Sequence, residues 1–228
     1  MPQAYQGKLI TFEGVDSSGK TTQWQQAVAW LQQTYPTLEV VQTRNPGGTP
    51  LGQTLRRLLL TPTEAEIGTA PMAPTTELLL YMADRAQHVA EVVIPALQRG
   101  AVVLCDRFID SSVAYQGGAR GLSTQMIHQL NEIACQGVVP DCTLLFDASP
   151  EVLASRMVAR GALDRLEQEG LSFQTKVREG FLAIQQAQPH RFRVIDASQP
   201  LAAVTQQVQN QLTTFFRVPL TQTSLSLL

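Results

Sequence analysis

A glycine-rich loop lies between a strand pattern and a helix pattern near the start of the chain. The stretch from Leu9 to Thr22 reads LITFEGVDSSGKTT and contains the spacing Gly14-x-x-x-x-Gly19-Lys20-Thr21. Glycines at the two ends of such a loop allow backbone conformations that a Cβ atom would block, so successive N–H groups can turn toward an anion. The lysine adds a positive charge for the β- and γ-phosphates, and the threonine hydroxyl is placed to bind Mg²⁺.

The residues around this loop support the same interpretation. The apolar run before it, from Leu9 to Phe12, is typical of a buried strand. After it, apolar residues from Trp24 to Leu31 recur at i, i+3, i+4 and i+7, the spacing of one helix face. A helix that begins directly after the loop directs its positive N-terminus at the same anion. The pattern therefore predicts a nucleoside triphosphate site formed by Gly14, Val15, Asp16, Ser17, Ser18, Gly19, Lys20, Thr21 and Thr22.

Composition narrows the classes of protein that remain. A chain of 228 residues with 44% hydrophobic and 16% charged residues can bury a sizeable core. Its net charge of −2 argues against nucleic acid as a main partner. The N-terminal residues have no signal-peptide pattern, and no apolar run approaches the ~20 residues of a membrane span. Because no such run is present, we expect no membrane partner. Cys105, Cys135 and Cys142 lack metal-ligand spacing, so we expect free thiols and a cytoplasmic protein.

Strand and helix patterns alternate along the whole chain. Apolar strand patterns occur at 9–12, 40–43, 101–105, 142–146 and 192–195. Helix patterns occur at 51–60, 75–99, 124–135, 150–160, 172–188 and 201–212, and Pro95 is expected to kink or end the second of these. Polar segments at 61–74 and 111–121 are expected to be loops. Charged residues at about 160–171 are expected to form a lid, and a solvated helix face is the alternative. The alternation predicts one α/β domain over 1–216, a doubly wound five-stranded parallel sheet with helices on both faces, and a flexible tail at 217–228.

Arginines recur near the predicted strand ends and in the lid, at Arg44, Arg85, Arg107, Arg160 and Arg165. Ligands of open α/β sheets bind beyond the carboxyl ends of the strands, where Asp106-Arg107 would lie. Tyr81 precedes Arg85 by one helical turn, so a ring and a guanidinium group project together. Several converging guanidinium groups suit a second anionic substrate beside the triphosphate.

At this point the sequence resembles the thymidylate kinase family, over roughly residues 8–210. The matching stretches are Phe12 to Thr22, Thr43 to Thr49, Leu80 to Arg85, Asp106 to Gly118, Arg160 to Glu167 and Asp196 to Ser198. The resemblance implies a nucleoside monophosphate kinase that uses ATP and Mg²⁺ to convert dTMP to dTDP for dTTP synthesis. It also implies a homodimer.

The resemblance also implies roles for individual residues. Catalysis would involve Lys20, Arg107, Arg160, Arg165 and Asp16, and the metal would be bound by Thr21 and Asp106. One branch of the family has an arginine at the position of Ser17, and the lid arginines resemble the other branch's replacement for it. The residues implied in dTMP binding are Asp16, Arg44, Arg56, Tyr81, Arg85, Arg107, Ser112, Tyr115 and Gln116. Two positions depart from the family pattern: Asn45, where Glu is usual, and Tyr81, where Phe is usual.

Other functions compete with this interpretation. A deoxynucleoside kinase shares the acid–arginine strand end but must deprotonate a hydroxyl, which calls for a carboxylate after the second strand. Here Arg44 and Asn45 occupy that place, which favours a phosphorylated acceptor. Another nucleoside monophosphate kinase is a further alternative. A nucleotide-dependent switch without phosphoryl transfer would have no use for lid arginines.

Overall fold

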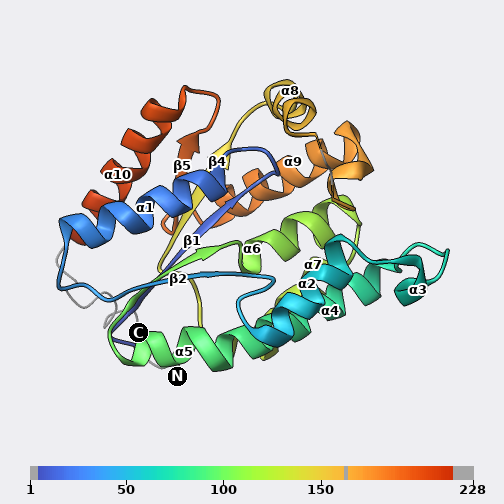
Figure 1. The fold of residues 1–228 in the computed structure, drawn as a ribbon, viewed down its shortest axis with the longest axis horizontal. Coiled ribbons are helices and arrows are strands. Elements are labelled where there is room, and N and C mark those ends of the chain that lie inside the picture. The colour runs from blue at the N-terminus through green and yellow to red at the C-terminus, as the bar shows by residue number, and fades with distance from the viewer. Residues whose placement is uncertain (1–4, 162–163, 218–228) are drawn as a thin grey trace.

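A five-stranded parallel sheet forms the centre of the computed structural model, which describes residues 5–161 and 164–217 (Figure 1). The strand order is β2-β3-β1-β4-β5, and every neighbouring pair is parallel. The sheet predicted from the alternating pattern is therefore confirmed. The strands are β1 Lys8–Gly14, β2 Val40–Arg44, β3 Val102–Asp106, β4 Cys142–Asp147 and β5 Phe192–Asp196.

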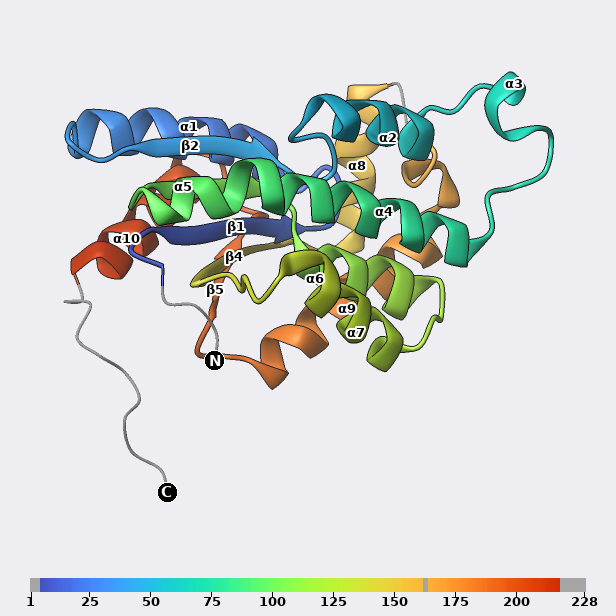
Figure 2. The same ribbon diagram turned by 90° about the horizontal axis from the view of Figure 1, so that it is seen from below.

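Helices cover both faces of this sheet. Helices α1 and α10 lie together on one face, and the α4–α5 rod, α6 and α9 lie on the other (Figures 1 and 2). The α-helices are α1 Lys20–Thr34, α2 Pro50–Leu60, α3 Glu64–Ile67, α4 Pro74–His88, α5 Ile94–Gln98, α6 Ile109–Ser112, α7 Thr124–Cys135, α8 Pro150–Arg160, α9 Leu171–Ala187 and α10 Leu201–Arg217. Two π-helices, η1 Val89–Val93 and η2 Val113–Ala119, and a 3₁₀ turn, η3 Glu167–Glu169, complete the described chain.

Strand β1 is the centre of the sheet because β3 and β4 pair with its two edges. Leu9, Ile10 and Phe12 are completely buried, and Ile10 and Phe12 lie in the same core cluster as Trp24 and Leu31 of α1. The order of the strands reverses at β1, so the crevice for a ligand opens beyond its carboxyl end. The phosphate loop begins at that end.

The helix predicted over 75–99 is not broken by Pro95. Instead, η1 widens the helix for five residues, and Pro95 then lies in the first turn of α5. A proline lacks the N–H that an α-helix needs and its ring clashes with the preceding turn, so a wider π-turn before it lets the rod continue. The prediction that the helix could end at this proline was therefore wrong, since α5 continues to Gln98.

The segment 111–121, predicted to be a loop, is largely helical. It forms the end of α6 and all of η2, where Ala114 and Tyr115 are buried against α9. The rings of Tyr115 and Phe181 meet edge to face at 6.2 Å. Packing against α9 thus overrides the weak helix propensity of a glycine-containing sequence.

Other details were closer to expectation. The connection 61–74 is irregular apart from the short α3. On α2, Leu59 is fully buried, whereas Leu51 is 51% exposed. No helix among the described residues is long and apolar enough to cross a membrane. The predicted tail lies outside the described residues except for Arg217, which ends α10.

Candidate active site

The loop from Gly14 to Thr21 has the backbone geometry of an anion site. Gly14 ends β1 with φ +141°, and a Cβ atom there would lie 2.5 Å from the Phe146 carbonyl oxygen. Ser17 and Gly19 also have positive φ, at 63° and 83°, and α1 begins directly afterwards at Lys20. Only glycine fits the first of these positions, which explains the loop's composition.

A cavity of about 450 Å³ opens over the N-terminus of α1. The hydroxyl oxygens of Ser17 and Ser18 are buried nearby and have no hydrogen-bond partner among the described residues. Burial lowers the pKa of Lys20, whose Nζ lies 3.6 Å from Asp16 Oδ1. The cavity, which we call the donor cavity, is lined by Asp16, Ser17, Gly19, Lys20, Thr21, Thr22, Arg56, Asp106, Arg107, Arg156, Asp164 and Glu167.

Six of the nine predicted triphosphate-binding residues therefore line this cavity. Ser18 lines an adjoining cavity that continues toward Gln23 and Leu201. Val15 is buried in the core and Gly14 belongs to β1, so neither residue lines the donor cavity. Their part is to shape the loop.

Arg107 lies beside the phosphate loop and lines the donor cavity. Its backbone has φ +68°, uncommon for a residue with a side chain, and its N–H donates to the Phe12 carbonyl at 3.0 Å. Nη2 donates to Asp16 Oδ1 at 2.5 Å and to the Tyr115 hydroxyl at 3.1 Å. Burial would raise the pKa of Asp16, but the charges of Arg107 and Lys20 outweigh it and hold that pKa well below its usual value. Asp16 is therefore a fixed anion.

Glu13, which we did not predict as a site residue, helps to hold Arg107 in position through Ser111. Its carboxylate accepts the Phe108 N–H at 2.7 Å and the Ser111 hydroxyl at 2.6 Å. Ser111 in turn accepts from Arg107 Nη1 at 3.1 Å. Burial and the charge of Asp110 raise the pKa of Glu13 to about 7. Its signal in the sequence is a charged residue inside the buried strand that precedes the loop.

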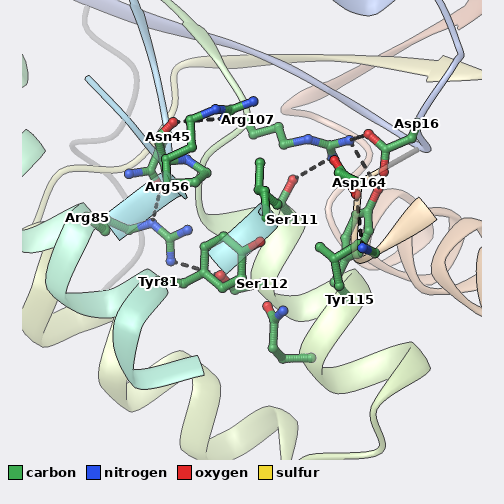
Figure 3. Close-up of a pocket in the computed structure, with 14 residues that line it drawn as sticks. Asp16, Asn45, Arg56, Tyr81, Arg85, Arg107, Ser111, Ser112, Tyr115 and Asp164 are labelled. Atoms are coloured by element: carbon green, nitrogen blue, oxygen red, sulfur yellow. Dashed lines mark hydrogen bonds and ion pairs between the residues drawn. The ribbon is translucent and has the colours of Figure 1, made fainter. Parts of the chain in front are cut away.

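A second cavity adjoins the first and is shown in Figure 3. We call it the acceptor cavity; it is lined by Asp16, Asn45, Pro46, Arg56, Leu60, Tyr81, Arg85, Arg107, Ser111, Ser112, Tyr115, Gln116, Asp164 and Leu166. Eight of the nine residues predicted to bind dTMP are among them. The exception is Arg44, whose guanidinium group stacks on Trp24 at 5.3 Å from the ring centroid.

Arg85 lies at the buried end of the acceptor cavity and is only 1% exposed. Its Nε donates to Asn45 at 2.9 Å, Nη1 donates to Ser112 at 3.0 Å and Asn131 at 2.6 Å, and Nη2 donates to the Phe108 carbonyl at 3.0 Å. Arg85 thus belongs to the lining of the acceptor cavity and not to the protein surface. Four of its five N–H groups have oxygen acceptors among the described residues, so one N–H group is left for a ligand.

The departure at Asn45 has a structural reason. Its amide oxygen accepts from Arg85, while its amide nitrogen donates to the carboxylate of Asp84. Burial raises the pKa of Asp84 to about 6. A glutamate at position 45 would place a second carboxylate against Asp84, so the amide suits this neighbour better.

The two residues predicted to bind a metal are in contact. Thr21 Oγ1 donates to Asp106 Oδ2 at 2.9 Å, and the other oxygen, Asp106 Oδ1, is buried without a hydrogen-bond partner among the described residues. Hydroxyl and carboxylate oxygens are ligands that Mg²⁺ prefers. Among all the residues that the structure describes, no group of three or more His, Cys, Asp or Glu side chains could hold a metal ion. Mg²⁺ bound through one or two protein oxygens, water and phosphate requires no such cluster.

The two predicted lid arginines have different positions. Arg165 donates to Glu77 at 2.6 Å and to the Leu59 carbonyl at 2.8 Å, and it lines neither cavity. Arg160 ends α8, but its side chain lies outside the described residues. Arg156, which we did not predict, lines the donor cavity. It lies four residues before Arg160, a spacing that places both on one helix face, and this spacing was the available signal.

Asp16, Arg56, Arg107 and Asp164 line both cavities. An anion in one cavity and an anion in the other would thus meet beside two guanidinium groups. A phosphate loop, a parallel sheet with β1 at its centre and an adjoining cleft rich in arginine define the class as P-loop phosphotransferases that act on a small anionic acceptor.

Comparisons with known proteins identify the family within this class. The sequence model of the thymidylate kinase family matches residues 12–208. A thymidylate kinase from Pseudomonas entomophila is 50% identical over 198 residues, 87% of this chain and 91% of that protein. One from Cyanothece sp. is 47% identical over 90% of this chain and 93% of its own length. The chain belongs to the thymidylate kinase family.

A solved structure agrees with this assignment. The crystal structure of thymidylate kinase from Ehrlichia chaffeensis is 34% identical to this chain and superimposes with a TM-score of 0.71. The match covers 90% of this chain and 98% of the other. The resemblance inferred from the sequence motifs is therefore confirmed.

Proposed function

We propose that this protein transfers the γ-phosphoryl group of ATP to dTMP and so forms dTDP and ADP. The observation that carries the proposal is the pair of adjoining cavities with Asp16, Arg56, Arg107 and Asp164 between them. Membership of the thymidylate kinase family supports the same reaction. The deoxynucleoside kinase alternative is disfavoured because Asn45, a neutral amide, lies where that reaction needs a base.

In this proposal, dTMP occupies the acceptor cavity. Its planar base lies against Tyr81, within reach of Arg85, Ser112, Tyr115 and Gln116, which also line the cavity. Its phosphate extends toward the shared guanidinium groups of Arg56 and Arg107. Burial lowers the pKa of Arg56. Bidentate guanidinium groups suit a phosphate better than a point charge would.

The reaction requires alignment of the two substrates and neutralisation of the negative charge on the transferred group. It requires little proton transfer. The attacking oxygen of dTMP is already anionic, so no strong general base is needed. Lys20, Arg107 and the α8 arginines Arg156 and Arg160 would stabilise charge on the transferred group. Asp16, held as an anion, would keep Arg107 in place and contact the deoxyribose. Closing of the 160–171 segment would exclude water.

Magnesium fits the oxygen pair of Thr21 and Asp106 described above. When bound with ATP, it would supply charge neutralisation at the β- and γ-phosphates. Thr21 would bind the ion through its hydroxyl, and Asp106 would contribute its unpaired oxygen, directly or through water.

The test is turnover with ATP and Mg²⁺ against dTMP, dUMP, dCMP, dGMP and thymidine. We expect dTMP to give the highest kcat/KM and thymidine to give no product. Preferential turnover of thymidine would favour a nucleoside kinase. ATP binding without product from any acceptor would favour a switch.

Two further proposals concern the setting of the protein. The three cysteines are free and buried, which supports a reducing compartment, and we place the protein in the cytoplasm. We also propose a homodimer, since Leu51 of α2 and Leu79 of α4 are each 51% exposed on packed helices. Light scattering after gel filtration would give about 50 kDa for the dimer, twice the 25.0 kDa of one chain.

A further inference from the structure

Glu77 of α4 is a buried carboxylate that lines neither cavity but contacts a residue that does. Its side chain is 1% exposed. Oε1 accepts from Gln116 Nε2 at 2.8 Å, and Oε2 accepts from Arg165 Nη2 at 2.6 Å and Arg120 Nη2 at 3.2 Å. Oε1 thus faces Gln116 of η2, with Arg120 Nε beside it at 3.4 Å, and Oε2 faces the Nη2 atoms of Arg165 and Arg120. We call Glu77, Gln116, Arg120 and Arg165 the Glu77 cluster.

The charge on Glu77 determines the orientation of the Gln116 amide. Burial would raise the pKa of Glu77, but hydrogen bonding from Gln116 and the charge of Arg165 outweigh it and lower that pKa. An ionised carboxylate can only accept hydrogen bonds, so Gln116 must turn its NH₂ group toward Glu77. The opposite atom of the amide is Oε1, a pure acceptor.

This acceptor is available to a ligand. Gln116 lines the acceptor cavity, and its Oε1 receives no hydrogen bond from any described residue. Among the described residues, several fully buried side-chain oxygen and nitrogen atoms have no hydrogen-bond partner, and Gln116 Oε1 is not one of these buried atoms. The cavity lining therefore includes an acceptor, Gln116 Oε1, and an N–H group of Arg85 that has no oxygen acceptor among the described residues.

We propose that Glu77 is a positioning residue that makes the acceptor cavity select a 4-oxo pyrimidine over a 4-amino pyrimidine. The ring N3–H of thymine or uracil donates to an acceptor, and its O4 accepts from an N–H group. Cytosine has the reverse pattern, because its N3 accepts and its N4 donates. The inference rests on the proposed function, in which the base lies against Gln116. A site whose polar atoms are left unpaired rejects the wrong ligand strongly.

The variant Glu77→Gln tests this directly. The amide oxygen of the variant side chain would lie on the side of Arg165 Nη2 and Arg120 Nη2, because these donors are closer than Arg120 Nε is to the other side. Its NH₂ group would then face Gln116. Gln116 would turn its own oxygen toward that NH₂ group and present a donor to the cavity. We expect the ratio of kcat/KM for dTMP to that for dCMP to fall by about tenfold or more, as loss of one good hydrogen bond implies.

Arg120→Gln is the matched control, because it removes a charge from the Glu77 cluster while the carboxylate still faces Gln116. Its dTMP/dCMP ratio should stay within about twofold of wild type. The charge-balanced double variant with Glu77→Gln and Arg120→Gln covers the case in which the single variant folds poorly. It should show the same loss of ratio as Glu77→Gln.

Equal losses of kcat/KM for dTMP and dCMP in the Glu77→Gln variants, with the ratio unchanged, would overturn the proposal and leave Glu77 a structural residue. That result is distinct from failure of the proposed function, in which the wild-type protein would not turn over dTMP at all. Melting curves of each variant show whether it is folded under the assay conditions.

Discussion

At the scale of single residues, Tyr81 is the side chain whose surroundings point most directly to a flat ligand. It is 8% exposed, lines the acceptor cavity, and its hydroxyl has no hydrogen-bond partner among the described residues. Tyr81→Ala should raise KM for dTMP by about tenfold or more, since stacking of a base on an aromatic ring is worth about 1–3 kcal/mol. The KM for ATP should change little. Tyr81→Phe keeps the ring and should keep KM for dTMP within about twofold, and an unchanged KM in Tyr81→Ala would remove this residue from the base site.

His88 predicts a dependence of stability on pH. Burial and the charge of Arg85 lower the pKa of His88 from 6.5 to about 4, and its Nε2 pairs with Thr43 at 2.6 Å. Between these pH values the unfolded chain binds a proton that the folded protein does not. The contribution of the neutral His88 side chain to the free energy of unfolding is therefore complete above pH 6.5 and is lost as the pH falls toward 4. The loss amounts to about 3 kcal/mol, at about 1.4 kcal/mol for each pKa unit.

The measurement is the free energy of unfolding in urea from pH 7 to pH 4, for wild type and His88→Gln. The variant cannot titrate, so its stability should fall less over this range, and the two curves should converge as the pH falls. Parallel curves would show that the imidazole at position 88 keeps an ordinary pKa.

The positions of several site residues could be predicted from the sequence motifs, and their roles stay predictions. The phosphate loop, Tyr81, Arg85 and Arg107 lie where the motifs indicated. Arg44 and Arg165 do not line the cavities, because Trp24 and Glu77 offer them closer partners. No pattern in the chain reveals such long-range pairings, which depend on the packed structure.

At the scale of elements, the contact between α9 and η2 positions the base-binding residues. A Cβ atom on Gly180 would lie 3.0 Å from Ala114 Cα and 3.2 Å from its carbonyl oxygen. Gly180→Val should therefore destabilise the protein by about 1–3 kcal/mol through overpacking. It should also raise KM for dTMP, because Tyr115 and Gln116 follow Ala114 on η2.

Ala183→Val, at an exposed position of the same helix, controls for the effect of a β-branched residue on helix propensity. Chemical denaturation and dTMP kinetics of both variants give the comparison. If Gly180→Val were no less stable than Ala183→Val, the close approach of the two helices would not be a constraint.

The segment 160–171 predicts an effect on the chemical step. Replacing both Arg160 and Arg165 with Ala should lower kcat by much more than about threefold, since charge donors to a transferred phosphoryl group are worth more than that. Arg99→Ala, at an exposed surface pair with Glu39, is the control and should leave kcat unchanged. Because Arg165 contacts Glu77 here, the single variants show which arginine carries the effect. A kcat within threefold in the double variant would exclude both.

Elements were predicted better than their connections. The strands and the helix α7 matched because their apolar periods are strong and their ends carry clear breakers. The π-helices were missed, since η1 depends on how Pro95 fits into the rod and η2 on contact with α9. Both are responses to packing, which local sequence does not encode.

At the scale of the whole molecule, one crevice at the carboxyl end of β1 serves two ligands. The donor cavity is formed by the phosphate loop and α8, and the acceptor cavity by α4, α6 and η2. The alternation of strands and helices predicted a doubly wound parallel sheet but not the order of its strands. The arrangement of two cavities around Arg107 could be seen only in the folded structure. Phosphoryl transfer in this protein depends on that arrangement.

A crystal structure with dTMP, Mg²⁺ and a non-hydrolysable ATP analogue tests this arrangement most directly. We expect the triphosphate on the Gly14–Thr22 loop, the base of dTMP against Tyr81, and the two phosphate groups facing each other beside Arg107. Density for dTMP outside the acceptor cavity, or with its phosphate turned away from Arg107, would contradict it.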